Sequence, residues 1–187
     1  MNIAVVIAVI AGLVSAVGWL VNYLLSSKAA LKRQRLISRL AHIEAQLKQL
    51  YGPLAFFIIE GRASALDLIS TFGRTPFTTG EELSTQELSQ WLFWVDNDFM
   101  PRNAAIQALL SGNSHLIDGE SIPGSYIEFL DHYNSWRVTH LRWKQEGFEY
   151  SWHSKIIWPE AFAKDVMDTF QALKKEHARL IGLVERS

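Results

Sequence analysis

The chain has 187 residues, of which 49% are hydrophobic, and it holds seven tryptophans, five tyrosines and ten phenylalanines. This composition excludes an intrinsically disordered chain, because disordered segments have too few large apolar side chains to form a core. The absence of cysteine excludes disulfide frameworks, zinc ribbons, cysteine-ligated clusters and thiolate nucleophiles.

The formal net charge of −1 conceals an uneven distribution along the chain. Residues 1–27 carry no charged side chain, and residues 28–43 carry five bases and no acid. All 19 acidic residues lie at Glu44 or beyond it, so the remainder of the chain is net acidic. A net acidic body is a poor nucleic-acid binder, and nucleic acid is therefore not an expected partner.

The segment Ile3–Leu25 predicts a membrane-spanning helix. It has no charged residue and is long enough to cross a hydrocarbon core of about 30 Å at about 1.5 Å per residue. Trp19 and Tyr23 lie near its C-terminal end, where amphipathic rings favour the membrane interface. The alternative is a cleaved signal peptide, but the run is too long, no base precedes it, and no small-x-small cleavage site follows it.

A basic segment follows the apolar run directly. Its bases are Lys28, Lys32, Arg33, Arg35 and Arg39. By the positive-inside rule they predict a membrane protein with its N-terminus outside and its C-terminal part in the cytoplasm. They also lie at the depth of anionic lipid headgroups, so membrane lipids are expected partners.

Two patterns predict self-association into a homo-oligomer. Small residues at every fourth position of the apolar run let helix backbones approach closely in lipid; they are Ala4, Ala8, Gly12 and Ala16. Apolar residues with alternating spacings of four and three then indicate a coiled-coil-like seam; they are Leu36, Leu40, Ile43, Leu47 and Leu50. The alternatives are an incidental small-residue stripe and a seam that packs on the chain's own body.

The first part of the chain after residue 51 predicts helices separated by breaks. Gly52-Pro53 should bend or break the first helix, and the apolar run Leu54–Ile59 predicts a buried turn beside it. Residues 73–83 have the composition of a loop. Ser84, with Glu87 three residues later, predicts a capped helix start.

A second break and restart is predicted at Met100-Pro101. The preceding Asp96, Asn97 and Asp98 suit a helix cap better than a cation site, because no EF-hand spacing surrounds them. Ser125 and Glu128 predict another capping box, opening a helix that Gly147 ends.

The C-terminal part completes an all-α fold class. Residues 148–158 are aromatic and irregular, and Pro159 opens the last helix. No segment alternates with a period of two between hairpin turns, so no sheet is expected. The predicted divisions are a transmembrane helix over 1–27, a basic coiled-coil-like helix over 28–51, and a cytoplasmic helical domain over 52–187.

A candidate polar face is predicted on the helix after Ser125, from His132, Arg137 and His140. The two histidines lie about 12 Å apart along a helix, which is too far to share a metal without other ligands. Packed aromatic rings with hydrogen-bonded imidazoles explain this face better. No metal, cofactor or catalytic residue is therefore expected.

An arginine and a histidine with four to six residues between them are the pair that helical ribonucleases of the HEPN type use. Arg35 and His42 have that spacing here, whereas Arg137 and His140 have only two residues between them. Acid–base cleavage of RNA would need the pair to meet its symmetry mate across a dimer. A HEPN-like ribonuclease therefore stands as an alternative.

Three regions of the chain carry a further resemblance. They are HIEAQLKQLYGPL (42–54), FMPRNAAIQALLSGNSHLIDG (99–119) with FLDHYNSWRVTHLRW (129–143), and PEAFAKDVMDTFQALKKEHARL (159–180). Together they resemble a group of uncharacterised bacterial helical proteins that have an LYGPL-type motif and a membrane anchor. The resemblance implies a helical body anchored in the bacterial inner membrane, and no assigned activity.

The architecture is also similar to that of the membrane accessory proteins of RNA-targeting CRISPR systems. Those proteins join an N-terminal membrane helix to a helical cytoplasmic domain and assemble into rings. Together with the two self-association patterns, this likeness implies an oligomeric effector or accessory protein whose anchors either gather in the inner membrane or perturb it, in phage defence. The alternative is a passive scaffold that recruits a soluble protein partner to the membrane.

Overall fold

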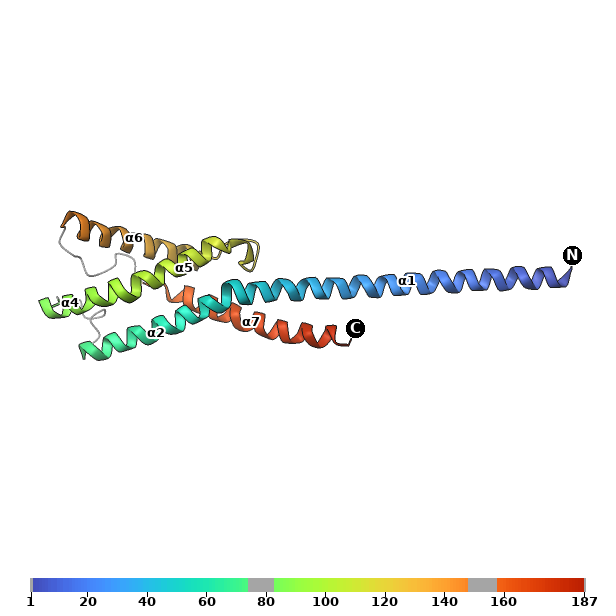
Figure 1. Cartoon of the computed structure of the whole chain (residues 1–187), viewed down its shortest axis with the longest axis horizontal. Helices are drawn as coiled ribbons and strands as arrows, with labels where there is room; N and C mark the ends of the chain where they lie inside the picture. The colour runs from blue at the N-terminus through green and yellow to red at the C-terminus, as the bar shows by residue number, and fades with distance from the viewer. Residues whose placement is uncertain (1, 74–82, 148–157, 187) are drawn as a thin grey trace. The chain divides into compact units, whose positions relative to one another are not determined.

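A computed structural model describes residues 2–73, 83–147 and 158–186, without the side chains at 4–6, 8–11 and 14. Every regular element in these ranges is a helix (Figure 1), so the all-α prediction is confirmed. The predicted loop over 73–83 and the irregular segment over 148–158 fall almost entirely outside the described residues.

The first helical stretch runs through three elements without interruption. They are α1 (Ile3–Gln46), the π-helical turn η1 (Leu47–Tyr51) and α2 (Gly52–Phe72). Of the bend or break predicted at Gly52-Pro53, the break does not occur. Proline lacks an N–H, and in an α-helix its ring collides with the carbonyl four residues earlier. The N–H of Gly52 donates to the carbonyl of Leu47, five residues back, and this wider turn accommodates the proline.

The wide turn at η1 requires glycine at position 52. A Cβ built on Gly52 would lie 2.5 Å from the carbonyl oxygen of Leu47. That atom is fixed backbone which accepts the π-type hydrogen bond, so no side-chain rotation relieves the clash. The clash is specific to the geometry of η1, because the corresponding position before Pro101 is a methionine, Met100.

A second proline is accommodated in the same way. Helix α4 (Thr85–Trp94) continues through the π-helical turn η2 (Val95–Phe99) into α5 (Met100–Gly112), which has Pro101 in its first turn. The N–H of Met100 donates to the carbonyl of Val95. The predicted break at Met100-Pro101 is wrong, and so is the capping role of Asp96–Asp98, since these residues lie inside a continuous helical stretch.

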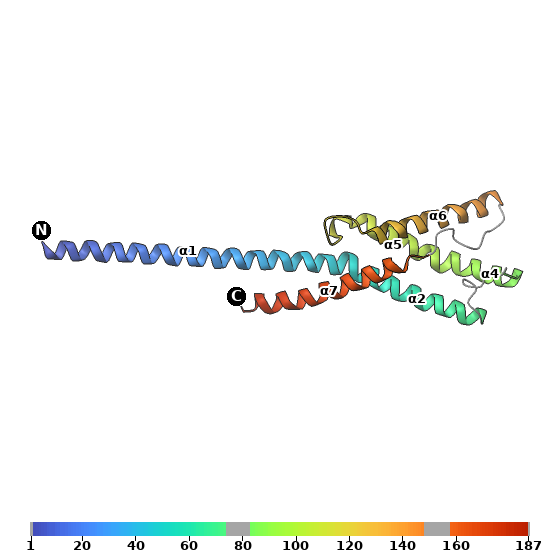
Figure 2. The same ribbon diagram turned by 180° about the vertical axis from the view of Figure 1, so that it is seen from behind.

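The remaining elements follow in order: the 3₁₀ turn η3 (Ser114–Leu116), α6 (Gly124–Glu146) and α7 (Glu160–Val184). Figure 2 shows the same helices from behind. The predicted stop at Gly147 is confirmed: the residue is left-handed, with φ of 68°, and its N–H donates to the carbonyl of Trp143.

One of the two predicted capping boxes is confirmed. The N–H of Ser84 donates to Glu87 Oε2 at 2.8 Å, and the N–H of Glu87 donates back to Ser84 Oγ at 3.3 Å. The box at Ser125 and Glu128 is wrong, because Pro123 precedes the first turn of α6 and Ser125 lies inside the helix. The hydroxyl of Ser125 instead donates to Asp165 Oδ2 of α7 at 2.6 Å.

The chain forms two compact units, Met1–Ile43 with Glu176–Ser187, and Glu44–Lys175. In the second unit, α2 packs against α5 and α5 packs against α6. Its core includes a cluster of Leu68, Trp91, Val95 and Trp136. The rings of Trp91 and Trp136 stack with centroids 5.9 Å apart, which joins α4 to α6.

The predicted burial of the run 54–59 holds for only part of it. Leu54 and Ala55 are buried, but Phe56 and Ile59 are 66% and 53% exposed. The helical period places these two on the side of α2 opposite Leu54 and Leu68. A continuous apolar run in a surface helix therefore presents apolar side chains on both faces.

We expect Gly52→Ala to destabilise the protein by about 2 kcal/mol, because the added methyl group meets fixed backbone in a packed turn. The matched control is Gly112→Ala, at a helical position where a Cβ meets no atom within 4 Å. Alanine there should stabilise the helix slightly. Thermal unfolding followed by circular dichroism measures both, and equal midpoints for the two variants would contradict the role of Gly52.

Candidate functional site

The basic residues of the predicted headgroup segment are all exposed on α1, and most of them share one face. A helix turns by roughly 100° per residue, so positions 28, 32, 35 and 39 fall within one narrow sector. The exposed bases of that face are Lys28, Lys32, Arg35 and Arg39. Arg33, also exposed, lies on another side of the helix.

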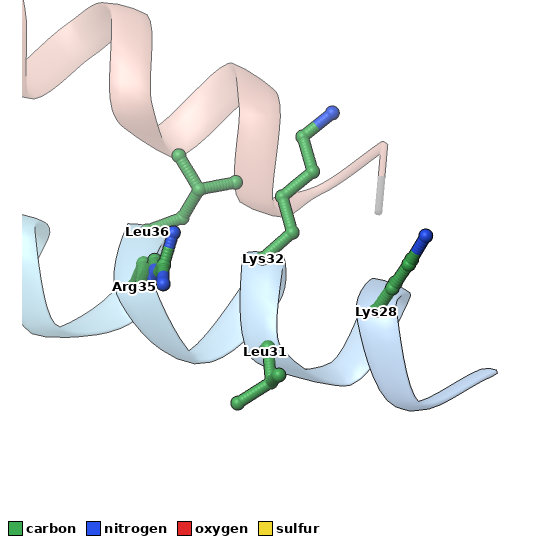
Figure 3. Close-up of a pocket in the computed structure, with 5 residues that line it drawn as sticks. All are labelled: Lys28, Leu31, Lys32, Arg35 and Leu36. Atoms are coloured by element: carbon green, nitrogen blue, oxygen red, sulfur yellow. The ribbon is translucent and has the colours of Figure 1, made fainter. Parts of the chain in front are cut away.

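Three of these bases line a shallow surface hollow together with two leucines. The lining residues are Lys28, Leu31, Lys32, Arg35 and Leu36. Figure 3 shows Leu36 directed toward the last turns of α7, with Lys28 and Lys32 extending on that same side of α1. Ammonium and guanidinium groups bind phosphate oxygens, and the long lysine stems can lie along apolar surface while their charges reach water.

Arg39 differs from the bases of the hollow, because it lies near an acidic side chain of α7. The hydrogen bonds from Arg179, both 2.7 Å long, are the main cause that lowers the pKa of Glu176, and the charge of Arg39 adds to the effect. Lys28, Lys32 and Arg35 therefore form the part of the basic face best suited to an external anion.

The apolar part of α1 exposes large side chains. Those described as exposed include Ile7, Leu13, Val17, Trp19 and Leu25. The rings of Trp19 and Tyr23 stack with centroids 5.8 Å apart. Among the described residues, no helix combines the length and the hydropathy of a membrane span.

The predicted small-residue stripe is described only in part. The side chains of Ala4 and Ala8 lie outside the described residues, whereas Gly12 and Ala16 are exposed. A Cβ built on Gly12 meets no atom within 4 Å. Within one chain, the surface at Gly12 is therefore open.

The predicted oligomer seam is mostly covered within the single chain. Ile43 and Leu50 are fully buried, and Leu36, Leu40 and Leu47 are partly buried. At Ile43 and Leu50 the seam follows the alternative, in which it packs on the chain's own body.

The predicted polar face of α6 divides between the interior and the surface. His132 and His140 are buried, whereas Arg137 is exposed, with its guanidinium 5.9 Å from the ring of Tyr133. The structure therefore does not bring Arg137 to the histidines. His132 makes edge contacts with the rings of Trp136 and Trp158, at centroid distances of 5.6 and 5.7 Å. This agrees with the packed aromatic interpretation.

His140 contacts a carboxylate that comes from the π turn η2. Its Nε2 lies 2.7 Å from Asp96 Oδ1, and Lys144 donates to the same oxygen at 2.5 Å. Partial burial raises the pKa of the Asp96 carboxyl, but the hydrogen bonds and charges of Lys144 and His140 outweigh it and lower the pKa. No group of three or more potential metal ligands occurs among the described residues.

A buried polar network at the junction of η1 and α6 was not predicted. The N–H of Asp118 donates to Tyr51 Oη at 2.9 Å, and Tyr51 also bonds to Tyr126. Burial is the first cause that raises the pKa of both tyrosines. Nearby, Gln46 Nε2 donates to the carbonyl of Leu116 at 3.0 Å. The sequence signal was weak, because Tyr51 and Asp118 are 67 residues apart.

Comparison with family models, curated proteins and solved structures finds no match to the chain. The functional argument therefore rests on the residues themselves.

We expect Asp96→Asn to destabilise the protein at neutral pH by about 1.5 kcal/mol, because it removes a charged acceptor of two hydrogen bonds. The lowered pKa means that the carboxylate stabilises the fold above its ordinary value of 3.8, and that this stability is lost as the pH falls through the folded-state pKa. The difference between wild type and variant should therefore shrink below about pH 4.

Unfolding midpoints from pH 2 to pH 7 measure this difference. The matched control is Asp168→Asn, which removes an exposed i,i+4 pair with Lys164 and should change stability little at any pH. A constant difference across the titration would contradict the contribution of Asp96.

Proposed function

We propose that the chain is a single-pass inner-membrane protein that self-associates as an accessory protein. Ile3–Leu25 of α1 enters the bilayer, the bases of residues 28–39 meet anionic headgroups, and the helical body lies on the cytoplasmic side. The observation that carries this proposal is an uncharged, exposed apolar helix that leads directly into exposed bases on the same helix.

The apolar segment supports anchoring through its composition and its exposure. An isolated helix that is hydrophobic on all sides is stable only when a core or a membrane covers it. The described side chains at Leu13, Val17 and Leu20 are at least half exposed. Within the apolar segment, the side chains that are not described, at 4–6, 8–11 and 14, belong to alanine, valine or isoleucine.

Self-association is supported by the open surface at Gly12. Close approach of helices in lipid depends on small residues at spacings of four. Gly12 and Ala16 have that spacing, and no atom of the same chain occupies the space beside Gly12. The space beside Gly12 is therefore available to the helix of a second copy.

A second candidate function is a membrane scaffold that recruits a soluble partner. The burial of Ile43 and Leu50 favours it, because two positions of the predicted coiled-coil seam are already covered in one chain. Self-association and recruitment differ in the mass of the purified protein, which decides between them.

We expect the protein to stay in the membrane pellet after an alkaline carbonate wash. The double variant Leu13→Arg with Val17→Arg should move to the supernatant, because each charge near the centre of a span costs about 3 kcal/mol. Immunoblots of both fractions measure the partition. The control is Gln145→Arg, at an exposed position on α6, and it should partition as wild type. Release of wild type by the wash would overturn the anchor.

In mild detergent we expect a defined oligomer that Gly12→Leu weakens by roughly tenfold in association constant, since leucine separates closely packed backbones. The matched control is Gly18→Leu. Gly18 is equally open but lies on a different face of the helix, so its variant should keep the wild-type mass. Light scattering measures the masses. A wild-type monomer would reject self-association and leave the scaffold function.

A further inference from the structure

Helix α2 has two opposite faces, and one of them packs inside the second unit. Leu54 and Leu68 are fully buried on this inner face. Ser64 Oγ donates to Asp98 Oδ2 of η2 at 2.5 Å, and a Cβ on Gly61 would lie 3.3 Å from the guanidinium of Arg102 on α5. These contacts fix the rotation of α2 about its own axis.

The opposite face of α2 is apolar and exposed. Phe56, Ile59 and Leu66 are 66%, 53% and 58% exposed. Single exposed apolar residues are common on protein surfaces, but these share one side of one helix. Ala63 and Ser70, also exposed, lie in the same line.

The spacing of this row is that of a helix–helix seam. We define the α2 stripe as the row of five exposed residues Phe56, Ile59, Ala63, Leu66 and Ser70. Their separations alternate between three and four, as in the a and d positions of a two-stranded coiled coil. Phe56, Ala63 and Ser70 then occupy a positions, and Ile59 and Leu66 occupy d positions.

The charges beside the stripe select an orientation for a second helix. Arg62 occupies a g position and Asp67 the following e position, and both are exposed. In a parallel pair in register, each g residue faces the e residue five positions later on the partner helix. Arg62 then meets Asp67 of the second copy, and symmetry repeats the pair on the other side.

The antiparallel arrangement is electrostatically unfavourable. In a pair centred on Ala63, the e positions of the two helices face each other, so Glu60 meets Asp67 of the second copy. Like charges in contact repel. The charge pattern therefore fits a second copy of this same chain in one direction.

We infer that the α2 stripe is the surface on which a second copy of the chain docks, as a parallel helix pair in register with Arg62 paired to Asp67. This inference rests on the proposed self-association and names a surface for it. A seam of two heptads is short, but two chains held in one membrane meet at a high effective concentration. Anchoring thus makes a short seam sufficient.

The test uses the full-length chain in its membranes. Because the chain has no cysteine, Ala63→Cys adds a single thiol at the a position, where a parallel pair brings the two sulfurs within reach of a disulfide. After mild oxidation, a non-reducing gel should show most of the protein at twice the monomer mass. The control is Asn134→Cys, exposed on α6, which should remain monomeric.

Charge exchange tests the orientation in the Ala63→Cys background. Arg62→Glu places two acids together and should reduce cross-linking roughly fivefold, whereas Arg62→Glu with Asp67→Arg restores the pair and should restore the yield. All three positions are exposed, so circular dichroism should be unchanged. Failure of the double exchange to restore cross-linking would overturn the parallel register.

Two measurements on the same membranes separate this inference from the proposed function. Cross-linking of Ala63→Cys no greater than that of Asn134→Cys, with an oligomer still present in detergent, would overturn the α2 stripe and leave self-association intact. The same lack of cross-linking with a monomer in detergent would overturn both.

Discussion

The packing of the helices in the second unit depends on how the chain accommodates two prolines without ending a helix. Pro53 and Pro101 each follow a π-helical turn whose closing N–H reaches five residues back. Each turn adds one residue to the helical stretch, which rotates the following helix by roughly 100° relative to an uninterrupted α-helix. The two turns therefore decide which faces of α2 and α5 meet, and with them the contacts of Ser64 and Gly61.

Each π turn also directs a polar side chain toward α6. Tyr51 of η1 bonds to Tyr126 in the first turn of α6, and Asp96 of η2 contacts His140 and Lys144 near its other end. A π turn re-aims side chains that an α-helix would point elsewhere. Each π turn that accommodates a proline therefore also forms hydrogen bonds to α6, η1 near the start of that helix and η2 near its end.

Local signals in the sequence predicted local structure well. The capping box at Ser84 and the stop at Gly147 depend on residues within one turn, and both were correct. The breaks expected at the two prolines do not occur, because the rule that proline breaks a helix assumes α-helical geometry. Ser125 was misread because its hydroxyl partner, Asp165, lies 40 residues away. A hydrogen bond between residues far apart in the chain produces no periodic pattern in a single sequence.

The row of residues 36–50 and the α2 stripe have the same heptad-like spacing, and periodicity alone does not distinguish them. Leu50 of the first row is fully buried, and the neighbouring Gln46 is equally buried and bonded to the carbonyl of Leu116. Heptad spacing indicates contact between helices, and in the first row Leu50 makes that contact within one chain. The α2 stripe has the same spacing, but its apolar side chains are exposed and its flanking charges, Arg62 and Asp67, are both exposed. Burial and flanking charge, rather than spacing, identify the row that remains for a second chain.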